Sequence, residues 1–145
     1  MTVSRIIAAK GSYIFTTQPH RTVLEVVKIL AEKRIGAVVV TGADGSLKGI
    51  VSERDIVRAI ARTGGAALEE PVSRHMTVDV ITCQETDLIS DVMSEMTRGG
   101  FRHMPVVCGA GKLTGMVSIR DVVKQRIAET EAESQSLRDY IQMAS

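Results

Sequence analysis

The sequence contains no tryptophan and only two phenylalanines and two tyrosines, so aromatic side chains make up 3% of its 145 residues. Proteins that bind single-stranded nucleic acid stack bases on aromatic side chains, so this composition argues against that function. The net charge does not support nucleic-acid binding either, because 18 basic and 17 acidic residues leave a formal net charge of +1. Binding to nucleic acid or to an acidic membrane surface normally requires a basic excess. We therefore expect neither nucleic acid nor a membrane among the partners of this chain.

Long hydrophobic runs are also missing. The longest runs, such as residues 37–40, contain four apolar residues, whereas a membrane-spanning helix needs about 20. The apolar stretch at residues 6–9 ends at Lys10 and is too short for the core of a secretory signal. Cys83 and Cys108 form no Cys-x-x-Cys pair and are too few for a disulfide framework. These absences predict a cytoplasmic globular protein.

Motifs of common catalytic sites are absent too. The sequence has no Gly-x-x-x-x-Gly-Lys-Ser/Thr phosphate loop and no Gly-x-Ser-x-Gly nucleophile elbow. Its three histidines and two cysteines show no metal-ligand spacing. We therefore expect no enzymatic activity, no metal site and no enzyme cofactor, and an enzyme is the least favoured of the functional alternatives.

The feature that the sequence does contain is an internal repeat. Residues 80–124 align without a gap on residues 14–58 at a shift of 66, and 12 of these 45 pairs are identical. The identities concentrate in the block Gly-x-Val-Ser-x-Arg-Asp-x-Val, at residues 49–57 and 115–123. Further upstream the shift is 69, so the first copy holds three additional residues near Lys10. A repeat of this kind predicts a duplicated structural unit.

Each copy predicts the same order of elements: strand, helix, strand, strand, helix. Short β-branched segments at 14–16 and 78–82 precede apolar residues at helical spacing in 23–30 and 88–96. Two strands joined by a Gly-containing turn follow, and the second runs directly into a helix. We predict an α+β fold of two pseudo-two-fold-related β-α-β-β-α repeats with a C-terminal helix. The predicted parts are a first repeat, a linker, a second repeat and a C-terminal helical extension, at 1–63, 64–71, 72–127 and 128–145.

Neither repeat is expected to be stable alone, because about 65 residues is a marginal size for burying a core. Packing the two copies together would cover the apolar sheet face that each exposes. Beyond the second repeat, apolar and small residues alternate spacings of four and three along a continuing helix: Val123, Ile127, Thr130, Ser134, Leu137, Ile141 and Ala144. We expect this helix to pack on the rest of the chain or on a second subunit.

The blocks Ser52–Asp55 and Ser118–Asp121 are the strongest local signal for a site. A serine at a helix N-cap with an acidic residue three positions later forms a capping box. In this motif the side chain of each of the two residues accepts a hydrogen bond from the backbone N–H of the other. Capping does not account for the arginine that recurs between them or for the preceding glycine. A helix start beside a cleft is also a natural ligand site, where the aspartate can accept both hydroxyls of a ribose. Capping alone and capping with ligand contact therefore both remain open.

The repeated motifs resemble those of a tandem CBS-domain pair, also called a Bateman module. They are Gly-Ile-Val-Ser-Glu-Arg-Asp at 49–55, Phe-Arg-His-Met-Pro-Val at 101–106 and Gly-Met-Val-Ser-Ile-Arg-Asp at 115–121. The chain is similar in particular to stand-alone bacterial proteins that consist of one such pair. This resemblance implies a regulatory module whose clefts, between the repeats, bind an adenosine-containing ligand. AMP is the expected ligand, with ATP, ADP, NAD(H) or S-adenosylmethionine as alternatives.

The resemblance also implies roles for individual residues. Ribose contacts would come from Ser52 and Asp55 in one cleft and from Ser118 and Asp121 in the other. The phosphate-binding candidates are Arg102, His103, Arg54 and Arg120. The candidates for the base cleft are Ile14, Ile81, Thr82, Met104, Pro105 and Met116.

The two clefts are not expected to be equivalent. The second repeat has Arg102-His103 where the first has Gly36-Ala37, so we expect unequal occupancy. The resemblance also implies a homodimer built on the helices that follow each Ser-x-x-Asp block; the sequence does not identify a regulated partner protein. A purely structural dimerisation module, in which the repeated motif only caps helices, is the remaining alternative.

Overall fold

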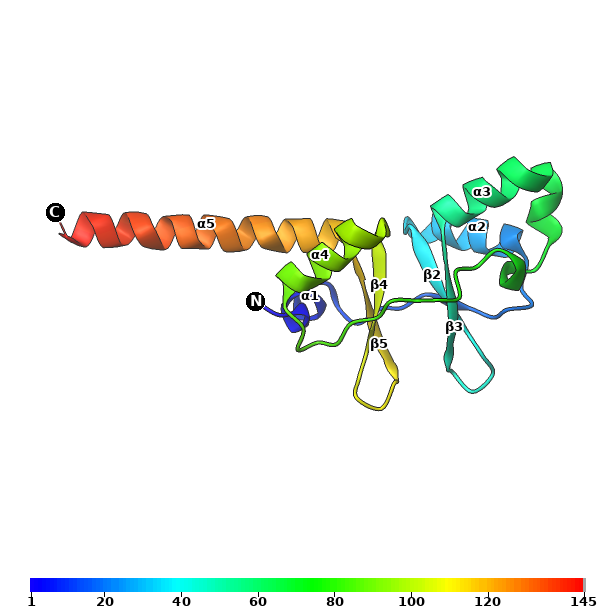
Figure 1. Cartoon of the computed structure of the whole chain (residues 1–145), viewed down its shortest axis with the longest axis horizontal. Coiled ribbons are helices and arrows are strands. Elements are labelled where there is room, and N and C mark those ends of the chain that lie inside the picture. The colour runs from blue at the N-terminus through cyan, green and yellow to red at the C-terminus, as the bar shows by residue number, and fades with distance from the viewer. Residues whose placement is uncertain (145) are drawn as a thin grey trace.

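Residues 1–144 are described by a computed structural model in which two similar halves lie side by side and one long helix projects from them (Figure 1). The first half contains β1 (Thr16–Thr17), α2 (Val23–Lys33), β2 (Ala37–Thr41), β3 (Leu47–Ser52) and α3 (Glu53–Thr63). The second contains α4 (Ile89–Gly99), β4 (His103–Val107), β5 (Leu113–Ser118) and α5 (Ile119–Ala144). The predicted α+β class with a C-terminal helix is confirmed; Ser145, the last residue of the predicted extension, lies outside the described residues.

The two sheets have matching register. In the first half β1 pairs parallel with β2, and β2 pairs antiparallel with β3, with Val38 opposite Val51. In the second half β4 pairs antiparallel with β5, with Met104 opposite Val117. The predicted strand at 78–82 is not formed: its half keeps only a parallel bridge between Cys83 and Val106. The chain just before this segment pairs instead with β3 of the other half, through a bridge between Ile50 and Thr77.

The segments that precede the two repeats are exchanged between the halves. Helix α1 (Val3–Lys10) comes first in the chain, but its buried residues Val3, Ile6 and Ile7 pack in the core of the second half. Its repeat counterpart is η2 (Val72–Arg74), a 3-10 turn after η1 (Gly64–Glu69), and Val72 packs in the core of the first half. The predicted boundary at residues 1–63 follows chain order, whereas the packing gives α1 to the second core. Each half therefore has in its core a residue from the segment that precedes the other repeat.

Helix α5 has a packed first part and an exposed second part. Val122 and Glu129 are buried, and Glu129 Oε2 accepts a hydrogen bond from Arg126 Nη1 at 2.7 Å. Residues 130–144 are exposed and extend away from the two halves (Figure 1). Among residues 1–144, no helix combines the length and the apolar character that crossing a membrane requires.

Candidate functional site

Two cavities open between the halves, and each lies at the start of one of the helices that follow a Ser-x-x-Asp block. The α3 pocket has a volume of about 190 Å³ and is lined by the start of α3, by residues in 77–81 and by residues 100–103. The α5 pocket has a volume of about 300 Å³ and is lined by residues in 10–15, by residues 34–37 and by the start of α5. The two linings correspond through the internal repeat, so the halves form two versions of one site.

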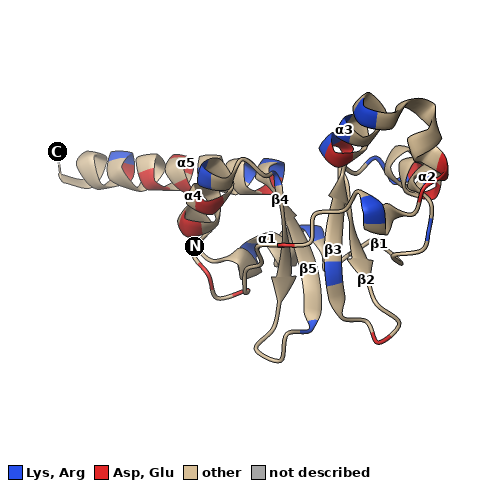
Figure 2. Ribbon diagram, turned by 45° about the vertical axis from the view of Figure 1, so that its right-hand side comes forward, with Lys and Arg blue, Asp and Glu red and all other residues tan. Residues whose placement is uncertain are grey.

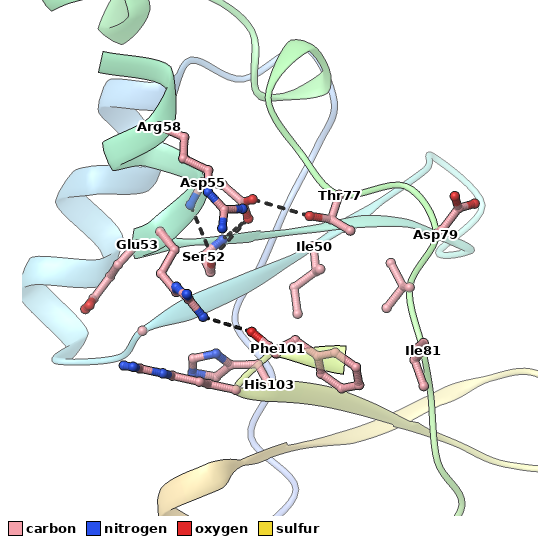
Figure 3. A pocket seen from close by; sticks show the side chains of 15 residues that line it. Ile50, Ser52, Glu53, Asp55, Arg58, Thr77, Asp79, Ile81, Phe101 and His103 are labelled. Atoms are coloured by element: carbon pink, nitrogen blue, oxygen red, sulfur yellow. Dashed lines mark hydrogen bonds between the residues drawn. The ribbon is translucent and has the colours of Figure 1, made fainter. Parts of the chain in front are cut away.

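The start of α3 is held by a complete capping box. Ser52 Oγ accepts a hydrogen bond from the backbone N–H of Asp55 at 3.4 Å, while Asp55 Oδ2 accepts one from the backbone N–H of Ser52 at 2.8 Å. The other carboxylate oxygen, Oδ1, accepts a hydrogen bond from the Thr77 hydroxyl at 3.3 Å, across the pocket. Both Ser52 and Asp55 line the α3 pocket (Figure 3). The carboxylate therefore caps its helix with one oxygen and presents the other to the cavity.

Apolar side chains from both halves form another part of the α3 pocket. Ile50 of β3, Ile81 of the connecting segment and Phe101 before β4 all line it. Figure 3 shows these three side chains beside one another, away from the polar group at Ser52 and Asp55. An apolar surface with a few placed polar groups is typical of a site for a small organic ligand.

Three arginines line the α3 pocket as well, namely Arg54, Arg58 and Arg102. Arg54 Nη1 donates a hydrogen bond to the backbone oxygen of Gly100 at 2.8 Å, so this side chain joins α3 to the other half. Acidic and basic residues follow one another along the ribbon at the start of α3 (Figure 2). Glu53, Asp55 and Asp79 supply the acidic groups of the lining, so formal charge in this pocket is balanced.

The glycine that recurs in both copies of the repeat block has a structural reason. A Cβ atom on Gly49 would lie 2.8 Å from the backbone oxygen of Thr77 and 2.7 Å from Met76 Sδ. A Cβ atom on Gly115 would lie 2.8 Å from Ile7 Cδ1 of α1. Each glycine therefore allows the exchanged segment to cross close to a strand.

The start of α5 has the same two capping contacts but a different third partner. Asp121 Oδ2 accepts a hydrogen bond from the backbone N–H of Ser118 at 2.9 Å, and Ser118 Oγ accepts one from the backbone N–H of Asp121 at 3.2 Å. The same Oδ2 atom forms an ion pair with Lys10 Nζ at 2.7 Å. Lys10 Nζ also donates to the backbone oxygen of Met116 at 3.0 Å. Ser118 and Lys10 line the α5 pocket, whereas Asp121 is not part of its lining.

The ion pair changes the acidity of Asp121. Burial acts to raise the pKa of this carboxyl, but the hydrogen bonds from Lys10 and Ser118 and the charge of Lys10 together lower the pKa below its usual value. Asp121 is therefore ionised at neutral pH, with its charge already compensated by a cation of the same chain.

Arg102 and His103 lie between the two pockets and line both of them. The His103 ring packs against Gly36, where a Cβ atom would lie 3.0 Å from both Cε1 and Nε2. Burial lowers the pKa of His103, the charges of Lys10 and Arg102 act in the same direction, and Glu53 and Asp121 oppose them. The imidazole is therefore neutral at pH 7 and can either donate or accept a hydrogen bond.

The structure distributes the sequence-predicted residues unevenly. Ser52, Asp55, Arg54 and Ile81 line the α3 pocket, Ser118, Arg120 and Met116 line the α5 pocket, and Arg102 and His103 line both. Four candidates for the base cleft line neither pocket: Ile14, Thr82, Met104 and Pro105. Successive side chains of extended chain point to opposite faces, so Met104 points into the second core while its neighbour His103 faces the pockets. Ile14 lies likewise between Tyr13 and Phe15, which line the α5 pocket.

Sequence reasoning missed several residues of the linings. Arg58 lies one helical turn after Arg54, and that spacing was the available signal for it. Thr77 and Lys10 had no such signal, because their contacts to Asp55 and Asp121 span 22 and 111 residues of chain. Within residues 1–144, no group of three or more histidine, cysteine, aspartate or glutamate side chains is placed to hold a metal ion.

Comparison with known proteins identifies the repeat. The sequence profile of the CBS domain matches residues 11–62 and again residues 72–127. The solved structure of a CBS-domain-containing protein from Agrobacterium tumefaciens is 43% identical, with a TM-score of 0.84, over 86% of this chain and 92% of that one. A mitochondrial CBS domain-containing protein of Arabidopsis thaliana is 36% identical over 139 residues, which are 93% of this chain and 66% of the relative.

A further similar structure was solved with a bound nucleotide. It is a CBS domain protein from Pyrobaculum aerophilum complexed with AMP, and it is 32% identical with a TM-score of 0.74. The match covers 83% of this chain and 89% of that chain.

Proposed function

The chain belongs to the CBS-domain family, and we propose on this basis that it is a regulatory adenine-nucleotide-binding module without catalytic activity of its own. The observation that carries the proposal is the α3 pocket. Its lining combines a sugar-binding type of carboxylate at Asp55, an apolar surface around Ile50 and Phe101, and arginines from both halves. These are the three chemistries that ribose, a purine base and a phosphate require.

In the proposed complex the ribose hydroxyls donate to Asp55 Oδ1, in place of the long bond from Thr77 at 3.3 Å. The Ser52 hydroxyl, at 3.0 Å from Asp55 Oδ2, adds a second polar contact at the same edge. The purine packs between Ile50, Ile81 and Phe101. A relative that shares 32% of the sequence is described as complexed with AMP, which supports a ligand of this class.

The phosphate is proposed to lie towards Arg102 and His103, with Arg58 as a further cation. Arg102 can offer two parallel N–H groups to a phosphate. Arg54 is already bonded to Gly100 at 2.8 Å, so we give it the role of holding the pocket together rather than that of the main phosphate ligand. A ligand bound here touches α3 of one half and residues 100–103 of the other. Binding would therefore favour one arrangement of the halves, to the extent that its affinity differs between arrangements.

Ligand binding by the purified full chain is the direct test. Adenosine, AMP, ADP, ATP, NADH and S-adenosylmethionine are titrated in turn by calorimetry, and thermal unfolding is followed with each ligand. A ligand at 100 times its Kd should stabilise the fold by about 2.7 kcal/mol. We expect AMP to bind and Arg58→Gln to weaken AMP more than adenosine. Arg62→Gln, at the exposed end of the same helix, is the matched control. If none of the six compounds binds, the structural dimerisation alternative replaces the sensor.

We also propose that the module acts as a homodimer through α3 and the first part of α5. Val57 on α3 is 66% exposed, and its repeat counterpart Val123 on α5 is 43% exposed. Ile60 and Ile127 add exposed apolar surface to the same two helices, and a second copy of the chain would cover all four side chains at once. Sedimentation velocity should give a dimer for the native chain and a monomer for Val57→Asp combined with Val123→Asp. A native monomer at micromolar concentration contradicts the proposal.

The compartment is proposed to be the cytoplasm. Cys83 and Cys108 are both free thiols in the structure, and burial raises the pKa of Cys83 to about 12. A thiol of this kind is unreactive, and unpaired cysteines fit a reducing environment.

A further inference from the structure

Helix α5 continues past the part of the chain that the CBS-domain profile matches. The second match ends at residue 127, whereas α5 runs without a break from Ile119 to Ala144. Residues 130–144 are all exposed and extend away from the two halves (Figure 1), over a length of about 22 Å. In proteins most helical stability comes from packing of one helix face, so a partner is expected for this segment.

The exposed apolar side of α5 does not face the two halves. Val122 and Glu129 are buried against the rest of the chain. Val123 and Thr130 follow them by one residue, which is about 100° around the helix, and both are exposed. Exposed residues at alternating spacings of four and three continue this side, and we call the series the α5 seam: Val123, Ile127, Thr130, Ser134, Leu137, Ile141 and Ala144. Such spacing is typical of the contact line of a two-stranded coiled coil.

The α5 seam offers apolar surface that a second helix would cover. Ile127, Leu137 and Ile141 are 54%, 60% and 58% exposed. Thr130 Oγ1 already donates to the backbone oxygen of Arg126 at 3.0 Å, so its hydroxyl keeps a partner when it is covered. Polar residues at two of the seven positions make the seam weaker than an aliphatic one. It therefore suits a contact between subunits that also associate elsewhere.

The charges beside the α5 seam indicate what covers it. In a parallel two-stranded coil, a residue just before a seam position faces the residue five positions later in the other helix. Arg126 would then face Glu131 of a second copy, and Glu133 would face Arg138 of the second copy. Both pairs join opposite charges, and two-fold symmetry repeats each of them. Arg126 bonds Glu129 through Nη1, and its guanidinium has further N–H groups for this contact.

Antiparallel pairing along the full seam fits less well. With Thr130 beside Ser134, it would set Glu131 against Glu131 and Glu133 against Glu133 of the two copies. Like charges at these positions disfavour that arrangement. Parallel pairing also sets Val123 against Val123 of the second copy, and this residue already belongs to the homodimer face proposed above.

From these observations we propose that residues 123–141 of α5 pair in register with the same residues of a second copy, as a short parallel two-stranded coiled coil. The occupant is the chain itself, because its own charges are complementary across the seam. The coil extends the proposed homodimer, on which it rests only for the shared face at Val123 and Ile127, and it reaches beyond the residues that the CBS-domain profile matches. It does not depend on a ligand in either pocket.

The charge pairs are tested in the full chain by sedimentation velocity over a dilution series, which gives the Kd of the dimer. We expect Glu133→Arg to raise this Kd about tenfold, because it sets like charges beside Arg138 on both sides of the coil. Glu133→Arg combined with Arg138→Glu should restore the native Kd. Asp139→Arg makes the same change of charge on the outer side of the helix and is the matched control. Equal Kd values for Glu133→Arg and Asp139→Arg overturn the charge pairing.

The seam itself is tested with two serines that lie two residues apart. Ser134→Leu adds an apolar side chain within the seam and should lower the Kd of the dimer about tenfold or more. Ser136→Leu makes the same change outside the seam and should leave the Kd unchanged. Both serines are exposed, so neither change disturbs the cores of the halves. Equal effects of the two changes show that the seam is not the contact.

Cross-linking determines the orientation of the two helices. Leu137→Cys is combined with Cys108→Ser, while the buried Cys83 is kept, and oxidised glutathione is the oxidant. A parallel coil sets position 137 of one copy beside position 137 of the other, so we expect a covalent dimer. Ser136→Cys in the same background should give none. A cross-link that forms only between Leu137→Cys and Ile127→Cys indicates an antiparallel pair and overturns the proposal.

Failure of the coil and failure of the α3 interface give different results. Val57→Asp changes α3 alone, and Ser134→Asp changes the α5 seam alone. A dimer that Val57→Asp disrupts and Ser134→Asp does not weaken overturns the coil and keeps the α3 interface. A dimer that Ser134→Asp disrupts and Val57→Asp does not supports the coil and rejects the α3 interface. A native chain that stays monomeric at micromolar concentration overturns both.

Discussion

The α3 and α5 pockets are built around two copies of the same repeated block, but they differ in their electrostatics. In both, serine and aspartate cap a helix, at 2.8 Å for Ser52 to Asp55 and 2.9 Å for Ser118 to Asp121. Asp55 then accepts a hydrogen bond from the neutral hydroxyl of Thr77, whereas Asp121 is paired with the ammonium group of Lys10. A duplicated motif therefore fixes the backbone geometry of the site, while its electrostatics depend on the segment that packs beside it.

The two aspartates differ in their partners because different segments of chain precede the two repeats. The segment before the first repeat is longer than that before the second, and it forms the eight-residue helix α1 rather than the three-residue turn η2. The last residue of α1 is Lys10, which reaches Asp121. After η2 the chain is extended, and Thr77 pairs with Ile50 and faces Asp55. The two segments thus place a hydroxyl beside Asp55 and a cation beside Asp121.

The largest difference between the pockets is expected for the two aspartates. Asp55→Asn should reduce the affinity for adenosine by roughly 1.5–3 kcal/mol, through loss of hydrogen bonds to a charged acceptor. Asp121→Asn should leave adenosine affinity nearly unchanged, because its carboxylate is already paired. Calorimetry measures both. Each variant removes a negative charge from a helix start, which should cost up to about 1 kcal/mol of unfolding free energy in urea. Asp121→Asn should lose about 0.5–1 kcal/mol more, because it also breaks the ion pair with Lys10. Equal losses of affinity in the two variants contradict the distinction.

The glycines of the repeat block test how the exchanged segments pack. Gly49→Ala should cost about 1–3 kcal/mol of stability, because the new Cβ atom meets backbone at 2.8 Å. Gly115→Ala should cost less, since the atom it meets at 2.8 Å is the flexible end of Ile7. Gly65→Ala is the control, with nothing within 4 Å of its Cβ atom. Urea unfolding gives all three values, and a larger cost at Gly115 than at Gly49 is the opposite of what we expect.

Removing the ammonium group should make the pockets more alike. Lys10→Met is expected to reduce the unfolding free energy by about 0.5–1 kcal/mol at pH 7, as for a partly exposed ion pair. The pKa of Asp121 is lowered in the folded state, so this stabilisation is present above the usual aspartate pKa and disappears as pH falls through the folded value. Urea unfolding at pH 7 and pH 3 measures it.

Thr77→Val is the matched change in the other half, and its effect should depend less on pH than that of Lys10→Met, because it removes a neutral hydroxyl from beside Asp55 rather than a charged group. A Lys10→Met effect of the same size at both pH values would show that the ion pair is not its cause.

The smallest expected effect concerns His103, at the boundary between the pockets. Burial lowers its pKa below the usual 6.5, so the unfolded state binds more protons and stability falls as pH drops below that value. His103→Gln should remove this part of the pH dependence. An NMR titration of the ring should also show that the pKa of His103 rises when AMP binds, since a phosphate favours the charged imidazole. A pKa unchanged by AMP separates His103 from the phosphate.

Much of the fold was predictable because it depends on neighbours in the chain. Helical spacing placed Val23, Val26 and Leu30 on the buried face of α2, and the capping pattern marked the start of α3. The strand predicted at 78–82 failed because the chain near Thr77 pairs with β3 of the other half. β-branched composition predicts an extended segment but does not choose its partner.

The sequence alone determined the duplicated unit, the two capped helix starts and the presence of arginine near both, because each depends on residues close together in the chain or on the repeat itself. Only the tertiary structure decided which aspartate lines a pocket and which is paired with a lysine. Packing of α1 against the second half joins Lys10 to Asp121 across 111 residues, and no local pattern specifies a contact of that length. The tertiary structure also decided which face of β4 turns toward the pockets, so that His103 lines them and Met104 does not. The charge of each cavity is therefore a property of the assembled halves.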